Sequence, residues 1–249
     1  MNIPAISKIK YHNNVQLDYF GKDIKSTMIP VRSPYVLRHI GFLLDNTQIN
    51  SNEKGLDVGC GMGKFTLPLL ERGMKVSGLD LSPFLLTKFL EYNDNRFDVN
   101  LIASDILEAP EELNEKFDYI VGFFALHHFH NLHVCFQAMS RLVKPGGKIY
   151  FIEPNAWNIL YYFQIFFTPG MSWSGDKGVA KMRRSVFQKA GDFAGLSEMK
   201  ILKYGMFPPF LYNKKWGQRL EKIICSIPFF KPFQAFQLVS FTKPIDNGN

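Results

Sequence analysis

Residues 56–63 read Leu-Asp-Val-Gly-Cys-Gly-Met-Gly, and this stretch decides the fold. A short buried strand is predicted over residues 55–58, and a helix is predicted over residues 64–72. Glycines at positions 59, 61 and 63 let the backbone turn sharply and let a ligand lie against it, because no Cβ stands in the way. The free N–H groups at the start of the following helix favour electron-rich ligand groups. The pattern therefore predicts a loop that binds a nucleotide-like ligand.

Outward from this loop, strands alternate with helices as far as residue 153. Gly73 is expected to end the first helix, and Ser82 with Pro83 provides an N-cap and first-turn pair for the second. Alternation at this spacing indicates parallel βαβ units. The predicted fold class is α/β, with a doubly wound, mostly parallel sheet covered by helices. Strands are predicted over residues 55–58, 75–79, 100–103, 117–123 and 148–152, and a third helix over 134–142, followed by a turn at 145–147.

The segments on either side of this alternation are predicted to be additions to it. Residues 1–50 indicate a helical N-terminal extension, in which Ser33 and Pro34 begin a helix with apolar residues at helical spacing. Residues 51–249 form the main domain, with insertions at about 155–180 and 206–233. Insertions of this length usually form lids or binding surfaces. The elements expected after residue 153 are an apolar segment at 157–167, a loop at 169–178, a helix at 184–194, a strand at 199–204, an irregular segment at 208–232 and a last strand at 236–242.

Composition limits the class of protein. With 249 residues, 46% of them apolar, the chain can bury one sizeable core but hardly two. The three cysteines, Cys60, Cys135 and Cys225, form no closely spaced pair, so neither a disulfide framework nor a structural zinc site is expected. A reducing cytoplasm is the predicted location. The longest apolar stretch has about a dozen residues, whereas a helix that spans a bilayer needs ~20.

The net charge of +7 is compatible with nucleic acid or with an anionic membrane surface as a partner. The basic residues are scattered, apart from small groups such as Lys214 with Lys215. This distribution favours ordinary solubility, and peripheral contact with a membrane is kept as the alternative.

Spacing within the glycine loop excludes two common nucleotide sites. The dinucleotide fingerprint needs glycine at the first, third and sixth positions, and the sixth position here is Lys64. An acidic residue, Asp57, stands two positions before the first glycine. The Gly-Lys-Ser/Thr ending of a triphosphate-binding loop is also missing. The loop is therefore a poor match to nicotinamide, flavin and nucleoside triphosphate sites.

Together with this loop, four further motifs resemble those of class I S-adenosylmethionine-dependent methyltransferases, in particular the group that acts on small molecules. The match spans about residues 50–153, and each motif lies at the end of a predicted strand or at the turn before one. The resemblance implies a Rossmann-like sheet of seven strands, the last of them antiparallel. The four motifs are Gly-Leu-Asp-Leu-Ser at 78–82, Ser-Asp-Ile at 104–106, Phe-Asp-Tyr-Ile-Val at 117–121 with Ala-Leu-His-His at 125–128, and Leu-Val-Lys-Pro-Gly-Gly at 142–147.

The resemblance implies S-adenosylmethionine as the cofactor and gives roles to the matching residues. In similar proteins the carboxylate at the position of Asp80 holds the ribose hydroxyls. The acid at Asp105 meets the adenine amino group, and the N–H of Ile106 meets the adenine ring. Asp57 is assigned to the methionine amino group, directly or through water. The predicted cofactor-binding residues are Asp57, Gly59, Cys60, Gly61, Gly63, Asp80, Leu81, Ser104, Asp105, Ile106 and Phe123.

Methyl transfer requires an aligned nucleophile, the exclusion of water and, for a hydroxyl acceptor, a base. His127 and His128, at the end of the fourth strand, are the predicted catalytic residues, because neutral imidazole suits proton transfer near pH 7. The alternative is that one caps the next helix and the other lines the cofactor pocket. Glu153 and Asn155, after the fifth strand, are predicted with Tyr19 to bind the acceptor, although the first two could instead satisfy local backbone groups.

Four histidines lie close together at positions 127, 128, 130 and 133 and could supply metal ligands. No Asp or Glu accompanies them in the sequence, and a corner between a strand and a helix separates them. No metal site is therefore predicted.

The predicted function is S-adenosylmethionine-dependent methyl transfer to an oxygen or nitrogen of a small, rather apolar metabolite or lipid-like acceptor. Aromatic residues at Tyr11, Tyr19 and Phe20 and in the segments after 155 indicate an apolar acceptor pocket or a surface that docks to lipid. One alternative is methylation of RNA or other nucleic acid, but the Asn/Asp-Pro-Pro-Tyr tetrad, the Pro-Cys pair and an RNA-binding module are missing. The other is a non-catalytic S-adenosylmethionine-binding protein, against which the intact loop argues.

Overall fold

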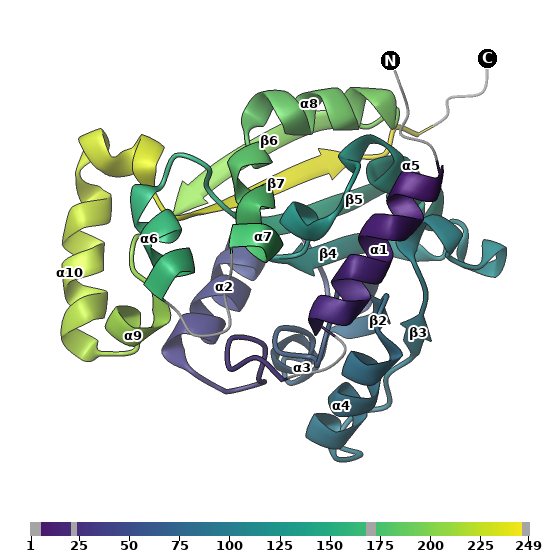
Figure 1. The fold of residues 1–249 in the computed structure, drawn as a ribbon, viewed down its shortest axis with the longest axis horizontal. Coiled ribbons are helices and arrows are strands. Elements are labelled where there is room, and N and C mark those ends of the chain that lie inside the picture. Colours follow the sequence, from purple (N-terminus) through teal and green to yellow (C-terminus); the bar gives the residue numbers. More distant parts are fainter. Residues whose placement is uncertain (1–5, 21–23, 168–172, 246–249) are drawn as a thin grey trace.

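The computed structural model describes residues 6–20, 24–167 and 173–245 of the chain. Within them, one sheet has the strand order β3-β2-β1-β4-β5-β7-β6 (Figure 1). The strands are β1 (Lys54–Val58), β2 (Lys75–Asp80), β3 (Leu101–Ala103), β4 (Phe117–Phe123), β5 (Val143–Pro154), β6 (Ser197–Tyr204) and β7 (Phe236–Thr242).

Strands β1 to β5 pair in parallel, and β7 lies antiparallel between β5 and β6. The prediction of a mostly parallel, seven-stranded sheet is confirmed. Strand order reverses between β1 and β4, and ligands of such sheets bind outside the carboxyl ends of the strands at this point. The turn expected at 145–147 lies inside β5, because Val143 already pairs with Phe117 before the register shifts to Lys148 and Tyr119.

The helices begin largely where the sequence predicts. Ser33 Oγ accepts from Val36 N, and Ser82 Oγ accepts from Leu85 N, so both expected N-caps are present. Helix α3 is shorter than predicted, because turns occupy the residues directly after the glycine loop. The helices are α1 (Ile6–Phe20), α2 (Pro34–Asp45), α3 (Thr66–Leu70), α4 (Pro83–Asn93), α5 (Leu132–Leu142), α6 (Ile159–Phe167), α7 (Trp173–Asp176), α8 (Arg184–Phe193), α9 (Pro209–Tyr212) and α10 (Lys215–Ser226), with the 3-10 helices η1 (Ile106–Glu108), η2 (Glu111–Leu113), η3 (Leu126–His128), η4 (Lys177–Lys181) and η5 (Pro228–Phe233).

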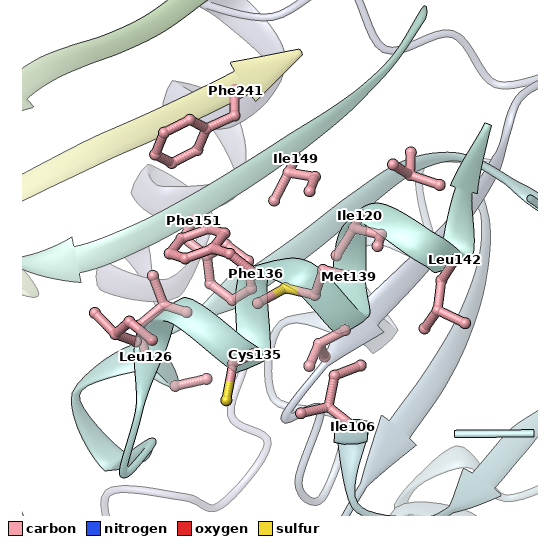
Figure 2. Close-up of a cluster of buried hydrophobic side chains, with 14 of the residues drawn as sticks. Ile106, Ile120, Leu126, Cys135, Phe136, Met139, Leu142, Ile149, Phe151 and Phe241 are labelled. Atoms are coloured by element: carbon pink, nitrogen blue, oxygen red, sulfur yellow. The ribbon is translucent and has the colours of Figure 1, made fainter. Parts of the chain in front are cut away.

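Both faces of the sheet are covered by helices. Along β5, Ile149 and Phe151 enter one core cluster, and Tyr150 and Ile152 enter the other. This alternation is the period of two of a β-strand. The first cluster packs the sheet against α5 and α8, with Phe136 and neighbouring side chains in its centre (Figure 2). The second packs it against α2, α3 and α4. The sheet is therefore doubly wound, as predicted.

Helix α6 falls within the apolar segment expected at 157–167. Tyr161 and Ile165 are buried, whereas Ile159 and Phe163 are 66% and 56% exposed. The helix thus has apolar side chains on an inner and an outer face. In the described part of the chain, no helix combines the length and the apolar character that crossing a membrane requires.

Candidate functional site

A cavity of about 590 Å³ lies outside the carboxyl ends of β1, β2, β3 and β4, at the reversal of strand order. Its wall combines the loops after these strands with α1, residues 25–29, Tyr161 of α6 and Phe210 of α9. The volume is within the range of about 300–1,000 Å³ found for small-molecule sites. The cavity can therefore hold a small ligand against the glycine loop.

The glycine loop packs closely against the loop after β4 at Gly59 and faces open space at Gly61. Gly59 and Gly61 have φ values of +78° and +53°, in the left-handed region that favours glycine. A Cβ on Gly59 would lie 2.8 Å from the Cβ of Ala125, so the loop after β4 requires glycine there. A Cβ on Gly61 would meet only the end of Met28 at 3.9 Å. A ligand can thus lie directly on the backbone at Gly61.

Asp80, at the end of β2, joins two loops of the cavity wall. Its Oδ2 accepts from Gly61 N and its Oδ1 from Ser82 N, each at 2.8 Å. Burial raises the pKa of Asp80, and these two N–H donors oppose that effect. Each carboxylate oxygen can accept a further hydrogen bond. A ligand with two adjacent hydroxyls fits this arrangement.

The turn after β3 forms another part of the wall. Asp105 Oδ1 accepts from Leu107 N at 3.0 Å and begins η1. Its Oδ2 accepts a short hydrogen bond from the side chain of Asn13, which ties α1 to the cavity. The other predicted cofactor residues that line the cavity are Gly59, Cys60, Gly61, Asp80, Leu81, Ser104, Ile106 and Phe123.

Two residues of the predicted cofactor set lie behind the wall. Asp57 is 2% exposed, and its Oδ2 accepts from Thr66 Oγ1 at 2.6 Å. Burial raises the pKa of Asp57 to about 7. Gly63 has φ +83°, and a Cβ there would press on the ring of Phe89 at 3.0 Å. Both residues support the loop from its inner side.

We expect Asp57→Asn to flatten the dependence of stability on pH. The pKa of Asp57 rises from the ordinary value of 3.8 to about 7 in the folded protein. Between pH 3.8 and about pH 7 the folded state therefore binds the proton more tightly than the unfolded chain does. The free energy of unfolding of the wild type should therefore fall as pH rises from about 5 to about 7, by about 2–3 kcal/mol relative to the variant, at about 1.4 kcal/mol per pH unit. Urea unfolding at several pH values measures it. The exposed Asp98→Asn serves as control, and parallel profiles for wild type and Asp57→Asn would contradict the expectation.

The side chain of His127 is buried and is held in place by Glu153. This side chain is 2% exposed, and its Nδ1 lies 2.8 Å from Glu153 Oε2. Glu153 Oε1 accepts from Ala125 N and Leu126 N at 2.8 and 2.7 Å. In the neutral tautomer that suits this contact, the imidazole donates from Nδ1 to Glu153 and Nε2 is left as the acceptor. Nε2 lies 3.9 Å from Asp176 Oδ1.

His128 lies beside His127, with ring centroids 4.0 Å apart, and also lines the cavity. The ligating atoms of His127, His128 and Asp176 lie within 4.8 Å of one another. The sequence has no acidic residue beside these histidines, but α7 brings Asp176 to His127 and His128 in the fold. The cation Lys25 also lines this part of the cavity; burial lowers its pKa to about 8, and the charge of Asp176 opposes that shift.

Two of the three predicted acceptor-binding residues, Glu153 and Asn155, do not line the cavity. Glu153 is fully buried behind His127, and Asn155 is 1% exposed, where its amide donates to the carbonyls of Pro232 and Gln234. The side chain of Tyr19 lies outside the described residues. Sequence reasoning did not find several residues that do line the cavity, since no motif marks them: Asn13, Gln16, Leu17, Lys25, Tyr161, Asp176 and Phe210.

Comparison with known proteins finds similar chains. A family model described as a methyltransferase domain matches residues 56–147. A demethylmenaquinone methyltransferase of Oceanobacillus iheyensis is 28% identical over 217 residues, which cover 80% of this chain and 87% of that protein. The protein of the same description from Staphylococcus carnosus is 28% identical over 169 residues, or 64% and 69% of the two chains.

A solved structure supports the same fold. Phosphoethanolamine N-methyltransferase 2 of Haemonchus contortus, in complex with S-adenosyl-L-methionine, matches with a TM-score of 0.63 at 17% identity over 96% of this chain. This chain spans only 58% of that protein. At such identity the likeness concerns the arrangement of the sheet and its helices.

Proposed function

Because this chain is a class I S-adenosylmethionine-dependent methyltransferase, we propose that it methylates an oxygen or nitrogen of a small, rather apolar acceptor. The observation that carries the proposal is the buried imidazole of His127. It is fixed by Glu153 on the wall of a cavity that also holds the cofactor loops.

The residues on the cavity wall fit S-adenosylmethionine. The carboxylate of Asp80 has one remaining acceptor position on each oxygen, which suits the two ribose hydroxyls. The open backbone at Gly61 leaves room for the ligand beside the loop. Asp105 and the N–H of Ile106, in the turn after β3, suit the adenine edge. We infer that these residues hold the cofactor, with Asp57 acting from behind the loop.

His127 acts as the base in the proposed reaction. When bound, S-adenosylmethionine supplies a methyl group made electrophilic by its sulfonium. Nε2 of His127 would take the proton that the acceptor oxygen or nitrogen gives up on methylation. Glu153 keeps the proton on Nδ1 and the ring in place. The charge of Asp176, 3.9 Å from Nε2, stabilises the imidazolium that forms.

An apolar acceptor is supported by apolar and aromatic side chains in the cavity wall. Leu17, Phe129, Tyr161 and Phe210 are among the lining residues, and apolar walls exclude water from the reacting atoms. The helices α6, α7 and α9, which carry part of this wall, are proposed to form the acceptor lid. Two of the similar proteins are named for demethylmenaquinone and one for phosphoethanolamine, which are small-molecule acceptors.

We expect methyl transfer to small molecules to survive removal of nucleic acid. The purified chain is incubated with S-adenosylmethionine tritiated in the methyl group and with cell extract, before and after nuclease treatment. Label should enter a fraction soluble in organic solvent and should persist after nuclease. Label found only in RNA or DNA would overturn the proposal, and no label in any fraction with intact cofactor binding would favour a non-catalytic binding protein.

A further inference from the structure

Helix α10 turns its apolar stripe away from the protein. Trp216, Leu220, Ile223 and, just past the helix, Ile227 recur at the spacing of one helical face. Their exposed fractions are 57%, 41%, 61% and 41%. In a helix that packs on a core, the corresponding stripe faces inward. The outward stripe is therefore a surface for something other than this chain's core.

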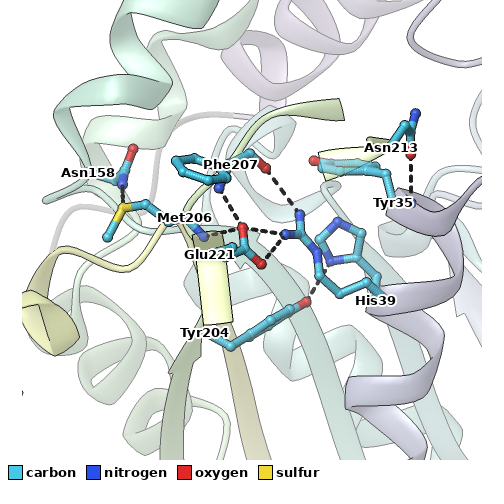
Figure 3. Close-up of polar contacts among 9 residues, drawn as sticks. Tyr35, His39, Asn158, Tyr204, Met206, Phe207, Asn213 and Glu221 are labelled. Carbon is cyan, nitrogen blue, oxygen red and sulfur yellow. Dashed lines mark hydrogen bonds and ion pairs between the residues drawn. The ribbon is translucent and has the colours of Figure 1, made fainter. Parts of the chain in front are cut away.

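The buried face of α10 fixes the rotation of the helix about its own axis. Glu221 is buried, and both its oxygens lie 2.8 Å from Arg38 Nη1. Its Oε2 also accepts from Met206 N and Phe207 N at 2.8 and 2.7 Å (Figure 3). Rotating the apolar stripe inward would break this buried ion pair and leave Arg38 unpaired, which is strongly unfavourable. The outward orientation is thus fixed.

The exposed apolar surface continues beyond α10 into η5. Phe229 and Phe233 of η5 are 72% and 41% exposed. Asn158 donates to the carbonyl of Phe233 at 2.6 Å, which places η5 beside the start of α6, where Ile159 is exposed. Helices α6 and α10 gather at one end of the molecule (left in Figure 1). We call this surface the α10–η5 face and define it by Trp216, Leu220, Ile223, Ile227, Phe229 and Phe233.

The exposed charged residues of the segment that carries the α10–η5 face are all basic. Between residues 206 and 234 the single acidic residue is Glu221, which is buried and paired with Arg38. On α10 the basic residues stand one position before the apolar ones and form a stripe beside them. The five basic residues of the segment, all exposed, are Lys214, Lys215, Arg219, Lys222 and Lys231.

The α10–η5 face adjoins the cavity through α9. Helix α9 packs on α10, where a Cβ on Gly217 would lie 2.1 Å from the carbonyl oxygen of Leu211. Phe210 of the same short helix lines the cavity and is 69% exposed. The rim of the cavity therefore lies next to the apolar and basic surface.

We propose that the α10–η5 face docks on the surface of an anionic lipid bilayer. Exposed aromatic and aliphatic side chains enter the boundary between headgroups and acyl chains, and the neighbouring lysines and arginine contact lipid phosphates. An apolar stripe beside a basic stripe is the pattern of a helix that lies in this boundary. Docking in this way brings the cavity rim to the membrane, where an apolar acceptor would be concentrated.

Cosedimentation of the full chain with vesicles tests the proposal. Wild type should bind vesicles of phosphatidylglycerol and phosphatidylcholine, bind pure phosphatidylcholine more weakly, and lose affinity as salt is raised. Trp216→Ser/Ile223→Ser and, separately, Lys215→Glu/Lys222→Glu should each lower the affinity for the anionic vesicles by at least about 10-fold. Matched controls are Leu90→Ser/Ile245→Ser and Lys116→Glu/Lys189→Glu, which change exposed residues elsewhere and should leave binding as in the wild type.

Circular dichroism establishes that each variant is folded. Absence of wild-type binding to anionic vesicles would overturn the proposal, as would equal losses in the α10 variants and their controls. A dimer in sedimentation velocity that Trp216→Ser/Ile223→Ser dissociates, without vesicle binding, would assign the face to a second copy of the chain instead. Because the measurement uses neither cofactor nor acceptor, its failure is distinct from failure of the proposed function.

Discussion

Asp80→Ala is expected to weaken the binding of S-adenosylmethionine by at least about 100-fold, since hydrogen bonds to a charged group contribute about 1.5–3 kcal/mol each. The carboxylate is proposed to hold the ribose hydroxyls. It also accepts from Gly61 N and Ser82 N, so its loss leaves both loops of the wall without their shared acceptor. Titration calorimetry of the purified chain with the cofactor measures the effect.

Two variants serve as references for this titration. Asp80→Asn keeps one acceptor oxygen and should show an intermediate loss. Asp98→Ala removes an exposed carboxylate outside the cavity and should bind like the wild type. If Asp80→Ala bound the cofactor within about twofold of the wild type, Asp80 would have no direct part in binding and the placement of the ribose would be wrong.

His127→Ala is expected to lower kcat by about 100- to 10,000-fold, the contribution typical of a positioned base. Affinity for S-adenosylmethionine should stay close to that of the wild type, because the proposed role concerns the acceptor proton. The measurement is methyl transfer to the acceptor fraction identified with the tritiated cofactor, combined with calorimetry of each variant.

The variant Glu153→Gln tests whether Glu153 positions the imidazole of His127 or only stabilises the folded chain. Its amide oxygen can still accept from Ala125 N and Leu126 N, but its amide nitrogen would face Nδ1 of His127 and favour the proton on Nε2. We expect a fall in kcat with little change in KM and an altered pH profile of kcat. His133→Ala, of a half-buried histidine that does not line the cavity, is the control. Full activity of His127→Ala would mean that the acceptor needs no base here.

The sequence predicts those parts of the fold that local chemistry determines. The bounds of β4 and β7 agree with the prediction residue for residue, because each strand is a short apolar run between turn signals. Ser33 and Ser82 cap their helices as predicted, since an N-cap bond joins residues three positions apart. The segment around α10 was expected to be irregular, and that prediction was wrong. Its buried face carries Gly217 and Glu221, so a search for an inward apolar stripe finds none.

The residues of the site also fall into two groups: those that sequence motifs located and those that only the fold brings together. Motif order located the loops with Gly61, Asp80 and Asp105, because each follows directly on a strand end at one edge of the sheet. Asp176 reaches His127 only because α7 folds against η3, and no spacing in the sequence indicates that approach. Glu153 was placed at the correct strand end, but the direction of its carboxylate depends on the three N–H groups that surround it. Such contacts between distant segments follow from the assembled fold.

The position of β7 has a consequence for how the chain is made. The ribosome produces β7 after β5 and β6, yet β7 pairs with both and lies between them. Phe241 belongs to one core cluster and Leu238 to the other. Both clusters are therefore incomplete until β7 has been synthesised. Until then β5 and β6 each present an open edge that can pair with another chain. We infer that the second half of the sheet assembles in one late step, and that nascent chains halted before residue 236 depend on chaperones to avoid aggregation.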